Sequence, residues 1–323
     1  MSRLEKIQRG LANVLAFAVG LYGVLMTLFL LLRPLVGESF VLVALFNHWL
    51  PALFFPSFVF LLACLIARRK RLMLLQTPAF LGFMLLYSAV LLPPPATTQP
   101  GETQFTLLTY NIQAQNPDYA RVEAVIRAAN ADIVVIQEII LEAAEYLQPA
   151  LADLYPYFAL HTDIEQGVFS RLPLSDDSSW RNPYGLYQRT VVEVGTQQVV
   201  LYNVHPYPPF WWSRGILNPA LHRAETEDTL TRASREQGAV LLVGDFNMSD
   251  QSEDYARVRA QYGDAFRAEG GGLGLTIPAT FPSARADYVF YNSAIVPIDA
   301  AVWGDAGGSD HFPVWVQLSL VGE

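Results

Sequence analysis

Side chains that can bind cations or move protons stand at the ends of several apolar runs. The clearest run, residues 240–244, ends in a glycine and is followed by Asp245, Phe246 and Asn247. A short apolar run closed by glycine predicts a buried strand, with Asp245 and Asn247 at its carboxyl end. Because side chains at positions i and i+2 of a strand face the same way, this carboxylate and carboxamide would lie side by side. Phe246 would then turn back into the core.

The same arrangement recurs along the rest of the chain. Predicted strands 105–111, 132–138 and 199–205 end in Asn111, Glu138 and His205, strand 287–291 starts at Asp287, and segment 308–318 places Asp310 and His311 before the last strand. Each residue taken alone has another interpretation, because acids and amides at strand ends start turns and a lone histidine packs. Together they predict one site with carboxylates for a hard cation and imidazoles as proton donors.

Helical segments alternate with these strands. Residues 119–130 have apolar side chains at helical spacing, residues 219–235 predict a polar amphipathic helix, and residues 167–174 and 189–194 predict further strands. This alternation predicts a layered α/β architecture in which two sheets form a sandwich.

Charge divides the chain into two parts. Residues 1–92 hold two acids, Glu5 and Glu38, and eight bases, whereas the rest holds 28 acids and 13 bases, all arginine, for a net charge of 13 − 28 = −15. A strongly acidic domain repels polyanions, so non-specific nucleic-acid binding is not expected. The single cysteine, Cys64, excludes a disulfide framework or a thiolate metal site.

Six short motifs, in order along the globular part, resemble those of a known family. They are YN at 110–111, QE at 137–138, the strand ending in His205, GDFN at 244–247, ADYVF at 286–290 and SDHFPV at 309–314. This ordered set resembles the endonuclease/exonuclease/phosphatase superfamily, to which deoxyribonuclease I and the neutral sphingomyelinases belong. The resemblance covers residues 105–320. It implies a four-layered α/β sandwich with the site at one end of two packed sheets.

The resemblance implies metal-dependent phosphoester hydrolysis. Such a reaction needs a cation to neutralise phosphoryl oxygens and an activated water. Glu138 is the expected ligand for Mg²⁺, with Mn²⁺ as an alternative, because Mg²⁺ keeps several waters and needs only one or two carboxylates. By the resemblance, Asn111 and Asp310 complete or orient this site. The number of metal ions, one or two, stays open.

The remaining motif residues are expected to act on water and phosphate. By the resemblance, Asp245 positions or deprotonates the attacking water and Asn247 hydrogen-bonds the phosphate. His205 and His311 can donate to phosphoryl oxygens, and the resemblance pairs His311 with Asp287, which favours the charged imidazole. The general base is either Asp245 or the His311–Asp287 pair.

The first ninety residues predict an integral membrane part with about three spans, at 11–32, 39–67 and 72–92, followed by a Pro-rich linker at 93–103 and the catalytic domain at 104–323. A cleavable signal peptide is the alternative for the first span, but its apolar run is too long for a signal core and no cleavage site follows it. Segment 39–67 is either one kinked span or an interfacial segment plus a span. His48, beside Trp49, is interpreted as an interfacial residue.

Basic residues predict the orientation. Arg3, Lys6 and Arg9 precede the first span, and residues 68–71 are all basic, whereas the first loop contains only Arg33. The positive-inside rule therefore places the N-terminus in the cytoplasm and everything after residue 92 outside it. The prediction is a protein of the plasma (inner) membrane with an extracytoplasmic catalytic domain.

An aromatic segment follows His205. Residues 206–212 read PYPPFWW, which is either a Pro-rich loop packed on the sheet or an exposed loop whose Phe210, Trp211 and Trp212 enter the lipid interface. With the acidic, lysine-free domain, the second interpretation favours a lipid head-group phosphodiester as substrate and the bilayer as partner. The alternatives are a surface-anchored nuclease or nucleotide or sugar phosphatase and, from another class, a catalytically inactive sensor or scaffold.

Overall fold

A computed structural model describes residues 2–91, 101–182, 185–211 and 216–321. The chain forms two compact units, residues 1–91 and residues 92–323. Residues 93–100, which form most of the predicted linker, lie outside the described residues.

The first unit is helical. Its helices are α1 (Arg3–Val36), α2 (Val41–His48), α3 (Leu50–Ile66), α4 (Lys70–Leu86) and α5 (Ser88–Leu91). Helix α1 begins with a capping box, in which Ser2 and Glu5 each accept a backbone N–H from the other. A Cβ at Gly23 would lie 2.5 Å from the carbonyl oxygen of Leu75, so glycine permits the close contact between α1 and α4.

The prediction of three membrane spans is wrong for the described residues. There, α1 alone is long and apolar enough to cross a membrane, and α2 with α3 passes the same test only as a pair bent by 70°. Helix α4 has 17 residues, which at about 1.5 Å each gives about 25 Å, less than a bilayer core of about 30 Å. Because α1 lies near the N-terminus, it could be a membrane anchor or a signal sequence.

The second unit contains two six-stranded sheets. The first has the order β13 (Ile295–Val302), β14 (Val314–Leu320), β1 (Gln104–Asn111), β2 (Ile133–Gln137), β4 (Gln166–Ser170) and β3 (Tyr157–His161). The second has the order β11 (Gly263–Asp264), β12 (Asp287–Tyr291), β10 (Ala239–Asp245), β7 (Gln197–Val204), β6 (Gly185–Val194) and β5 (Leu174–Asn182). A separate two-stranded sheet pairs β8 (Phe210–Trp211) with β9 (Ile216–Leu217) in antiparallel orientation.

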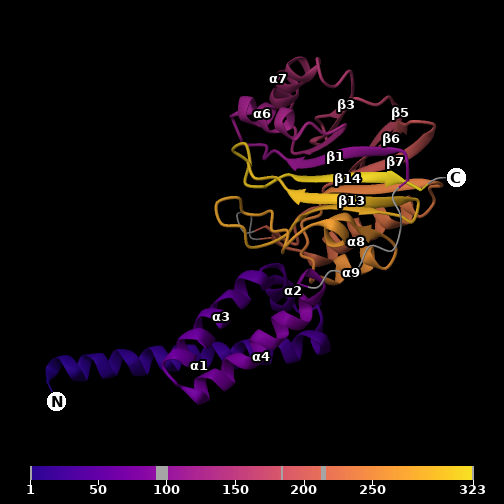
Figure 1. Cartoon of the computed structure of the whole chain (residues 1–323). Coiled ribbons are helices and arrows are strands. Elements are labelled where there is room, and N and C mark those ends of the chain that lie inside the picture. Colours follow the sequence, from indigo (N-terminus) through magenta and orange to yellow (C-terminus); the bar gives the residue numbers. More distant parts are fainter. Residues whose placement is uncertain (1, 92–100, 183–184, 212–215, 322–323) are drawn as a thin grey trace. The chain divides into compact units, whose positions relative to one another are not determined.

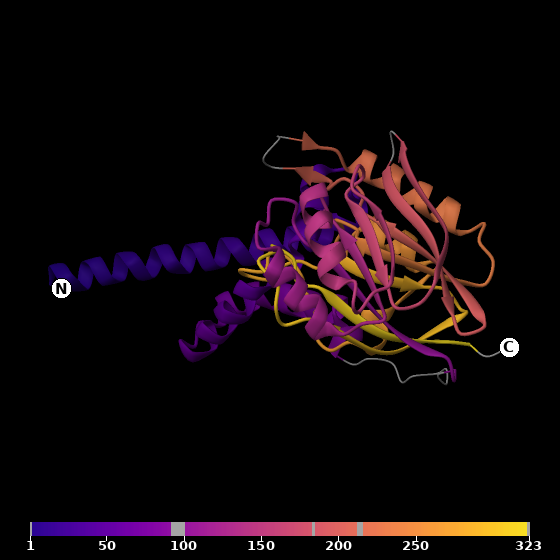
Figure 2. The ribbon, with the colours of Figure 1, turned by 90° about the horizontal axis from the view of Figure 1, so that it is seen from above.

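Helices cover the outer faces of both sheets. In Figure 1, α6 (Tyr119–Ala129) and α7 (Leu141–Leu151) lie on one side, and α8 (Pro219–Ala233) and α9 (Glu253–Arg259) on the other. Figure 2, seen from above, shows α6 and α7 in magenta lying over the strands. The short helix α10 (Ala265–Glu269) follows β11. The predicted four-layered sandwich is therefore confirmed.

Three apolar clusters hold these layers together. The largest fills the space between the sheets and includes Leu107, Val135, Leu201 and Leu241, all fully buried. A second lies between the first sheet and helices α6 and α7, and a third lies between the second sheet and helices α8 and α9. Strands buried on both faces read as continuous apolar runs, and this is why the sequence predicted β1, β2, β7 and β10 so closely.

Candidate active site

Two parallel strand pairs bring the predicted residues to one edge of each sheet. Strand β1 pairs with β2 so that Asn111 lies opposite Gln137, and β7 pairs with β10 so that Val204 lies opposite Gly244. Because both members of a parallel pair leave the sheet at the same edge, Asn111 and Glu138 come together, as do His205 and Asp245.

One side-chain amide joins the two edges. Asn111 Nδ2 donates to Oε1 of Glu138 and to Oδ2 of Asp245, at 3.0 Å in both cases. Asn111 Oδ1 accepts the backbone N–H of Gln113, which fixes the orientation of the amide. The carboxylates of two different sheets therefore share one hydrogen-bond donor.

Glu138 adopts a backbone conformation that is uncommon for its residue type. Its φ of 60° lies in the left-handed region, although it is not a glycine. Its Oε2 accepts the backbone N–H of Ala114 at 2.8 Å, and its side chain is 24% exposed. Such conformations often occur at functional sites, where the surrounding contacts maintain them. The structure thus presents a fixed carboxylate that solvent can reach, which suits a cation ligand.

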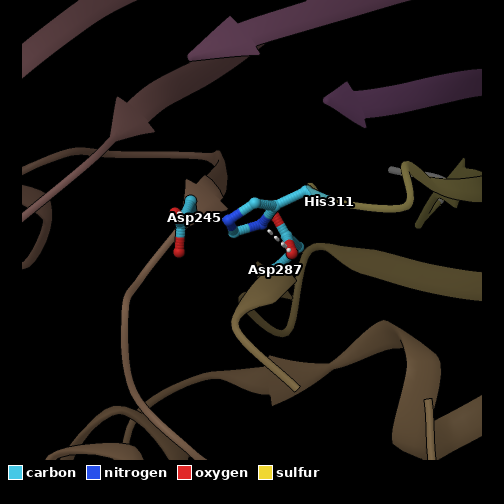
Figure 3. A group of neighbouring side chains, drawn as sticks. All are labelled: Asp245, Asp287 and His311. Carbon is cyan, nitrogen blue, oxygen red and sulfur yellow. Dashed lines mark hydrogen bonds and ion pairs between the residues drawn. The ribbon is translucent and has the colours of Figure 1, made fainter. Parts of the chain in front are cut away.

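Two imidazoles flank Asp245. Nε2 of His205 lies 3.6 Å from Asp245 Oδ2 and 3.9 Å from Glu138 Oε1, and Nε2 of His311 lies 3.7 Å from the same Asp245 oxygen. Nδ1 of His311 lies 2.9 Å from Asp287 Oδ2. Figure 3 shows the His311 ring between Asp245 and Asp287, with the hydrogen bond to Asp287 dashed. The pairing implied by the resemblance is present in this geometry.

The surroundings of His311 favour its charged form. Burial lowers the pKa of this imidazole, but the carboxylates of Asp287, Asp245 and Asp310 outweigh burial and raise it to about 10. The ring therefore donates from Nδ1 to Asp287 and presents an N–H at Nε2 towards Asp245. An imidazolium in this place is suited to stabilise negative charge on an oxygen.

The carboxylates at this edge fit a hard divalent cation. The pKa of Asp310 is raised by burial and by the negative charges of Glu138 and Asp245, although His311 opposes this change. Asp287 Oδ1 is buried and has no hydrogen-bond partner among the described residues. A divalent cation would offset the repulsion among these groups, and oxygen donors are what Mg²⁺ and Mn²⁺ prefer.

A group of three residues could also hold a metal ion. One ligand atom each from Asp245, Asp287 and His311 lies within 4.8 Å of the others. For His311 to coordinate a metal ion, a ring nitrogen would have to lose its proton, against the field of the neighbouring carboxylates. Glu138, Asn111 and Asp310, the ligand set that the resemblance implies, would need no such change.

Asn247 differs from the expectation of strand alternation. Strand β10 ends at Asp245, and Asn247 has a φ of 49°. The N–H of Asn247 donates to Asp245 Oδ1 at 2.8 Å, so Asp245 also starts a turn, and Asn247 Nδ2 donates to the carbonyl of Pro206 at 3.0 Å. Phe246 is 1% exposed and packs edge-on against Tyr288 and Phe290, as expected.

Sequence analysis did not single out Ser309. Its hydroxyl donates to the carbonyl of Asn111 at 2.7 Å and accepts the backbone N–H of His311 at 3.0 Å. Ser309 therefore ties the end of β1 to the loop that carries His311. Its place in the SDHFPV motif was the available signal.

A pair of buried amides was also missed. Gln137 Nε2 donates to Asn203 Oδ1 at 2.8 Å, which links the two sheets directly behind Glu138 and His205. Both residues are fully buried. Both amides lie close to site residues in the sequence, Gln137 directly before Glu138 and Asn203 two residues before His205. The sequence alone does not show that the two amides contact each other.

The aromatic segment after His205 is described in part. Phe210 and Trp211 form β8, which pairs with β9, and Trp212 lies outside the described residues. The segment leaves the site directly, because the carbonyl of Pro206 accepts a hydrogen bond from Asn247. Strands β8 and β9 lie between His205 and helix α8 in the sequence.

A four-layered α/β sandwich whose two sheets end in carboxylates, an amide and two imidazoles defines a hydrolase fold of the deoxyribonuclease I type. The sequence model of the Endonuclease/Exonuclease/phosphatase family matches residues 108–311, and the chain belongs to this family. Members of this family are hydrolases that act on phosphoester bonds, and they generally depend on divalent metal ions.

Solved structures agree with this assignment at the level of the fold. An endonuclease/exonuclease/phosphatase from Bacteroides vulgatus is 16% identical, with 68% of this chain and 100% of that chain covered and a TM-score of 0.55. A humanized D. rerio TDP2 is 18% identical, with the same coverage and a TM-score of 0.57, and so is D. rerio TDP2 complexed with a single-strand DNA product. Among proteins with curated descriptions, none matches this chain.

Proposed function

We propose that this protein is a cation-dependent phosphodiesterase that acts on a lipid head group or another phosphodiester close to a membrane. The observation that carries the proposal is the hydrogen bonding of Asn111, which joins Glu138 and Asp245 between the imidazoles of His205 and His311. A bound Mg²⁺ or Mn²⁺ would neutralise the phosphoryl and leaving oxygens. Glu138 would hold this ion, with Asn111 orienting the carboxylate and Asp310 adding charge.

The other residues then have separate tasks. His205 and His311 donate N–H groups to the phosphoryl oxygens, where negative charge builds up in the transition state. Asn247 has a second N–H, in addition to the one bound to Pro206, for the phosphate. Asp245 accepts from Asn111 and from the backbone of Asn247, which fixes its carboxylate for holding a water.

Asp245 is the better general base of the two candidates. His311 lies between the carboxylates of Asp287 and Asp245, an environment that keeps protons on both ring nitrogens. An imidazolium has no lone pair with which to take a proton from water. Asp245 therefore takes the proton, and His311 supplies positive charge and an N–H donor.

Three features support a membrane substrate. The globular part has a net charge of 13 − 28 = −15 and contains no lysine, which disfavours a polyanion such as DNA. A helical unit containing the apolar helix α1 precedes it. The aromatic hairpin residues Phe210 and Trp211 follow closely after His205, and aromatic side chains prefer the lipid interface. Arg3, Lys6 and Arg9 lie in the first part of α1 and Arg33 in its last turn. By the positive-inside rule we therefore propose that α1 is a single span, with a cytoplasmic N-terminus and an extracytoplasmic enzyme in the plasma (inner) membrane.

The test uses the full-length protein in detergent with bis-p-nitrophenyl phosphate. Turnover that needs Mg²⁺ or Mn²⁺, stops with a chelator, and is lost in Glu138→Gln and His311→Ala would support the chemistry. The matched control is Glu142→Gln, an exposed acid on α7. If turnover survives in both site variants, the proposed site is wrong.

A second experiment separates the substrates. The full-length protein is offered phospholipid liposomes and single-stranded DNA at equal phosphodiester concentration. Faster cleavage of the lipid supports the proposal. Faster cleavage of DNA supports a surface-anchored nuclease, the second candidate, which the similarity in fold to D. rerio TDP2 with its DNA product favours. A folded protein that cleaves nothing would be a binding protein.

A further inference from the structure

Helix α8 carries two ionisable residues on its buried face. His222 and Glu225 lie one turn apart and are 2% and 0% exposed. Burying such groups costs free energy unless each finds hydrogen-bond partners, and apolar residues could fill this face without that cost. The partners of these two residues are therefore informative.

Glu225 binds the loop that leaves His205. Its Oε2 accepts the backbone N–H of Tyr207 at 2.6 Å. Its Oε1 has no hydrogen-bond partner among the described residues. The carboxylate is thus committed to a backbone group two residues after His205.

His222 binds the loop that leaves β10. Its Nε2 lies 2.8 Å from the carbonyl oxygen of Phe246, and its Nδ1 lies 2.8 Å from Oδ2 of Asp254. A carbonyl accepts only, and so does an ionised carboxylate, so both ring nitrogens donate and the ring is an imidazolium paired with Asp254. Phe246 stands between Asp245 and Asn247, so this bond fixes the turn that carries both.

The two loops are also joined to each other. Asn247 Nδ2 donates to the carbonyl of Pro206 at 3.0 Å, next to Tyr207. The connections form a closed ring from α8 through Tyr207 and Pro206 to Asn247, Phe246 and back to α8. Other buried polar residues on α8 do not take part: Thr226 and Thr229 donate to carbonyls within their own helix.

We propose that His222 and Glu225 are positioning residues, which fix the His205 loop and the Asp245–Asn247 turn relative to each other for phosphoester hydrolysis. This inference rests on the proposed function. Each residue bonds a backbone group of one loop, and each therefore acts through the backbone that it holds. Since small misplacements of reacting groups lower rates steeply, releasing either loop lowers kcat while the cation ligand Glu138, on the other sheet, stays in place.

The kinetic test compares matched variants of the full-length protein. Glu225→Leu and His222→Leu remove the hydrogen bonds at similar volume, and Glu225→Gln keeps an acceptor for Tyr207. Thr229→Val alters a buried polar residue whose hydroxyl bonds within α8. We expect the two leucine variants to lose about ten-fold or more in kcat, with the cation concentration for half-maximal rate changed less than about two-fold. Glu225→Gln and Thr229→Val should keep the wild-type kcat.

Backbone amide exchange tests the same inference without turnover. Exchange at Tyr207 should accelerate in Glu225→Leu and exchange at Asn247 in His222→Leu, with both amides protected in Glu225→Gln and Thr229→Val. Wild-type kcat or unchanged exchange in the folded leucine variants would overturn the inference, as would equal loss of kcat in Thr229→Val. If the wild type hydrolyses no phosphoester, the proposed function fails, and exchange still decides whether α8 holds the loops.

Discussion

Asn111 Nδ2 lies 3.0 Å from Asp245 Oδ2, although the two residues are 134 positions apart and end strands of different sheets. The same nitrogen donates to Glu138. One amide therefore bonds both the proposed cation ligand and the proposed base. One sheet carries Asn111 and Glu138, and the other carries His205 and Asp245. The packing between the two sheets sets the distance between these pairs of residues.

Replacing Asn111 by leucine should remove the link between Glu138 and Asp245 with little change of side-chain volume. Glu138 Oε1 and Asp245 Oδ2 lose their shared donor, and groups that orient such ligands typically contribute about ten- to one-hundred-fold. We expect kcat for bis-p-nitrophenyl phosphate to fall by about that factor. Asn292→Leu is the control, because Asn292 donates to Gly238 at the opposite end of β10. Full activity in Asn111→Leu would show that the amide is dispensable.

Cation binding should stabilise the globular unit through Glu138. A ligand that binds only the folded state adds about 2.7 kcal/mol at about 100 times its Kd. We expect the unfolding midpoint to rise with Mg²⁺ or Mn²⁺ and to fall again with a chelator, measured by calorimetry. In Glu138→Gln the midpoint should not respond, whereas the exposed control Glu142→Gln should respond like the wild type. An equal response in all three proteins would place the cation elsewhere.

Glu225 makes stability depend on pH. Burial raises the pKa of this carboxyl from 4.5 to about 7, against the opposing effects of the Tyr207 N–H and His222. Between these values the folded protein keeps a proton that the unfolded chain has released, so the free energy of unfolding falls as pH rises through this window. In Glu225→Gln that loss is absent.

The measurement is urea unfolding of the wild type and Glu225→Gln from pH about 4.5 to about 8. The stability difference between them should grow across the window and then stay constant. Glu227→Gln, an exposed acid on the same helix, should follow the wild type at each pH. Parallel curves for all three proteins would mean that Glu225 titrates normally.

A buried ion pair anchors the region before Asp287. Arg285 donates through both terminal nitrogens to Asp264, with side chains 1% and 0% exposed, and the guanidinium lies 4.3 Å from the ring centroid of Tyr288. Removing one partner of such a pair leaves a buried charge and typically costs about 3–5 kcal/mol. Arg285→Met should show this loss in urea unfolding. The double variant with Asp264→Asn should recover part of it, and a double variant no better than the single would contradict this account.

Sequence predicted the strands that carry the site residues well, but it missed β3, β5, β13 and helix α7, and it did not show which side chains meet. The apolar runs before Asn111, Glu138 and Asp245 are buried on both faces, so the sequence predicted where these strands begin and end. The hydrogen bonds that position the site residues run from side chains to backbone groups far away in the sequence. Examples are His222 to the carbonyl of Phe246 and Ser309 to the carbonyl of Asn111. The spacing of residues along the sequence does not indicate such a contact. His222 was not singled out, because its helix was predicted only as polar and amphipathic.

The helical unit shows the opposite limit. Three apolar stretches predicted three spans, of which 39–67 was expected to be either one kinked span or an interfacial segment plus a span. The helix is interrupted at Trp49, which lies between α2 and α3, and the axes of these two helices differ by 70°. Hydropathy therefore overstated the number of helices that are each long enough to span a membrane, although it correctly found α1.

The aromatic segment after His205 is expected to act at the lipid interface. If Phe210, Trp211 and Trp212 enter the lipid interface, replacing all three by serine should lower turnover of a liposomal phosphodiester by about ten-fold or more, because interfacial binding scales with buried apolar area. Turnover of bis-p-nitrophenyl phosphate, which needs no interface, should be unchanged. Tyr157→Ser is the control: Tyr157 is 41% exposed and pairs with Ser170, at the sheet edge opposite Glu138. Equal loss on both substrates would instead assign the segment to packing beside His205.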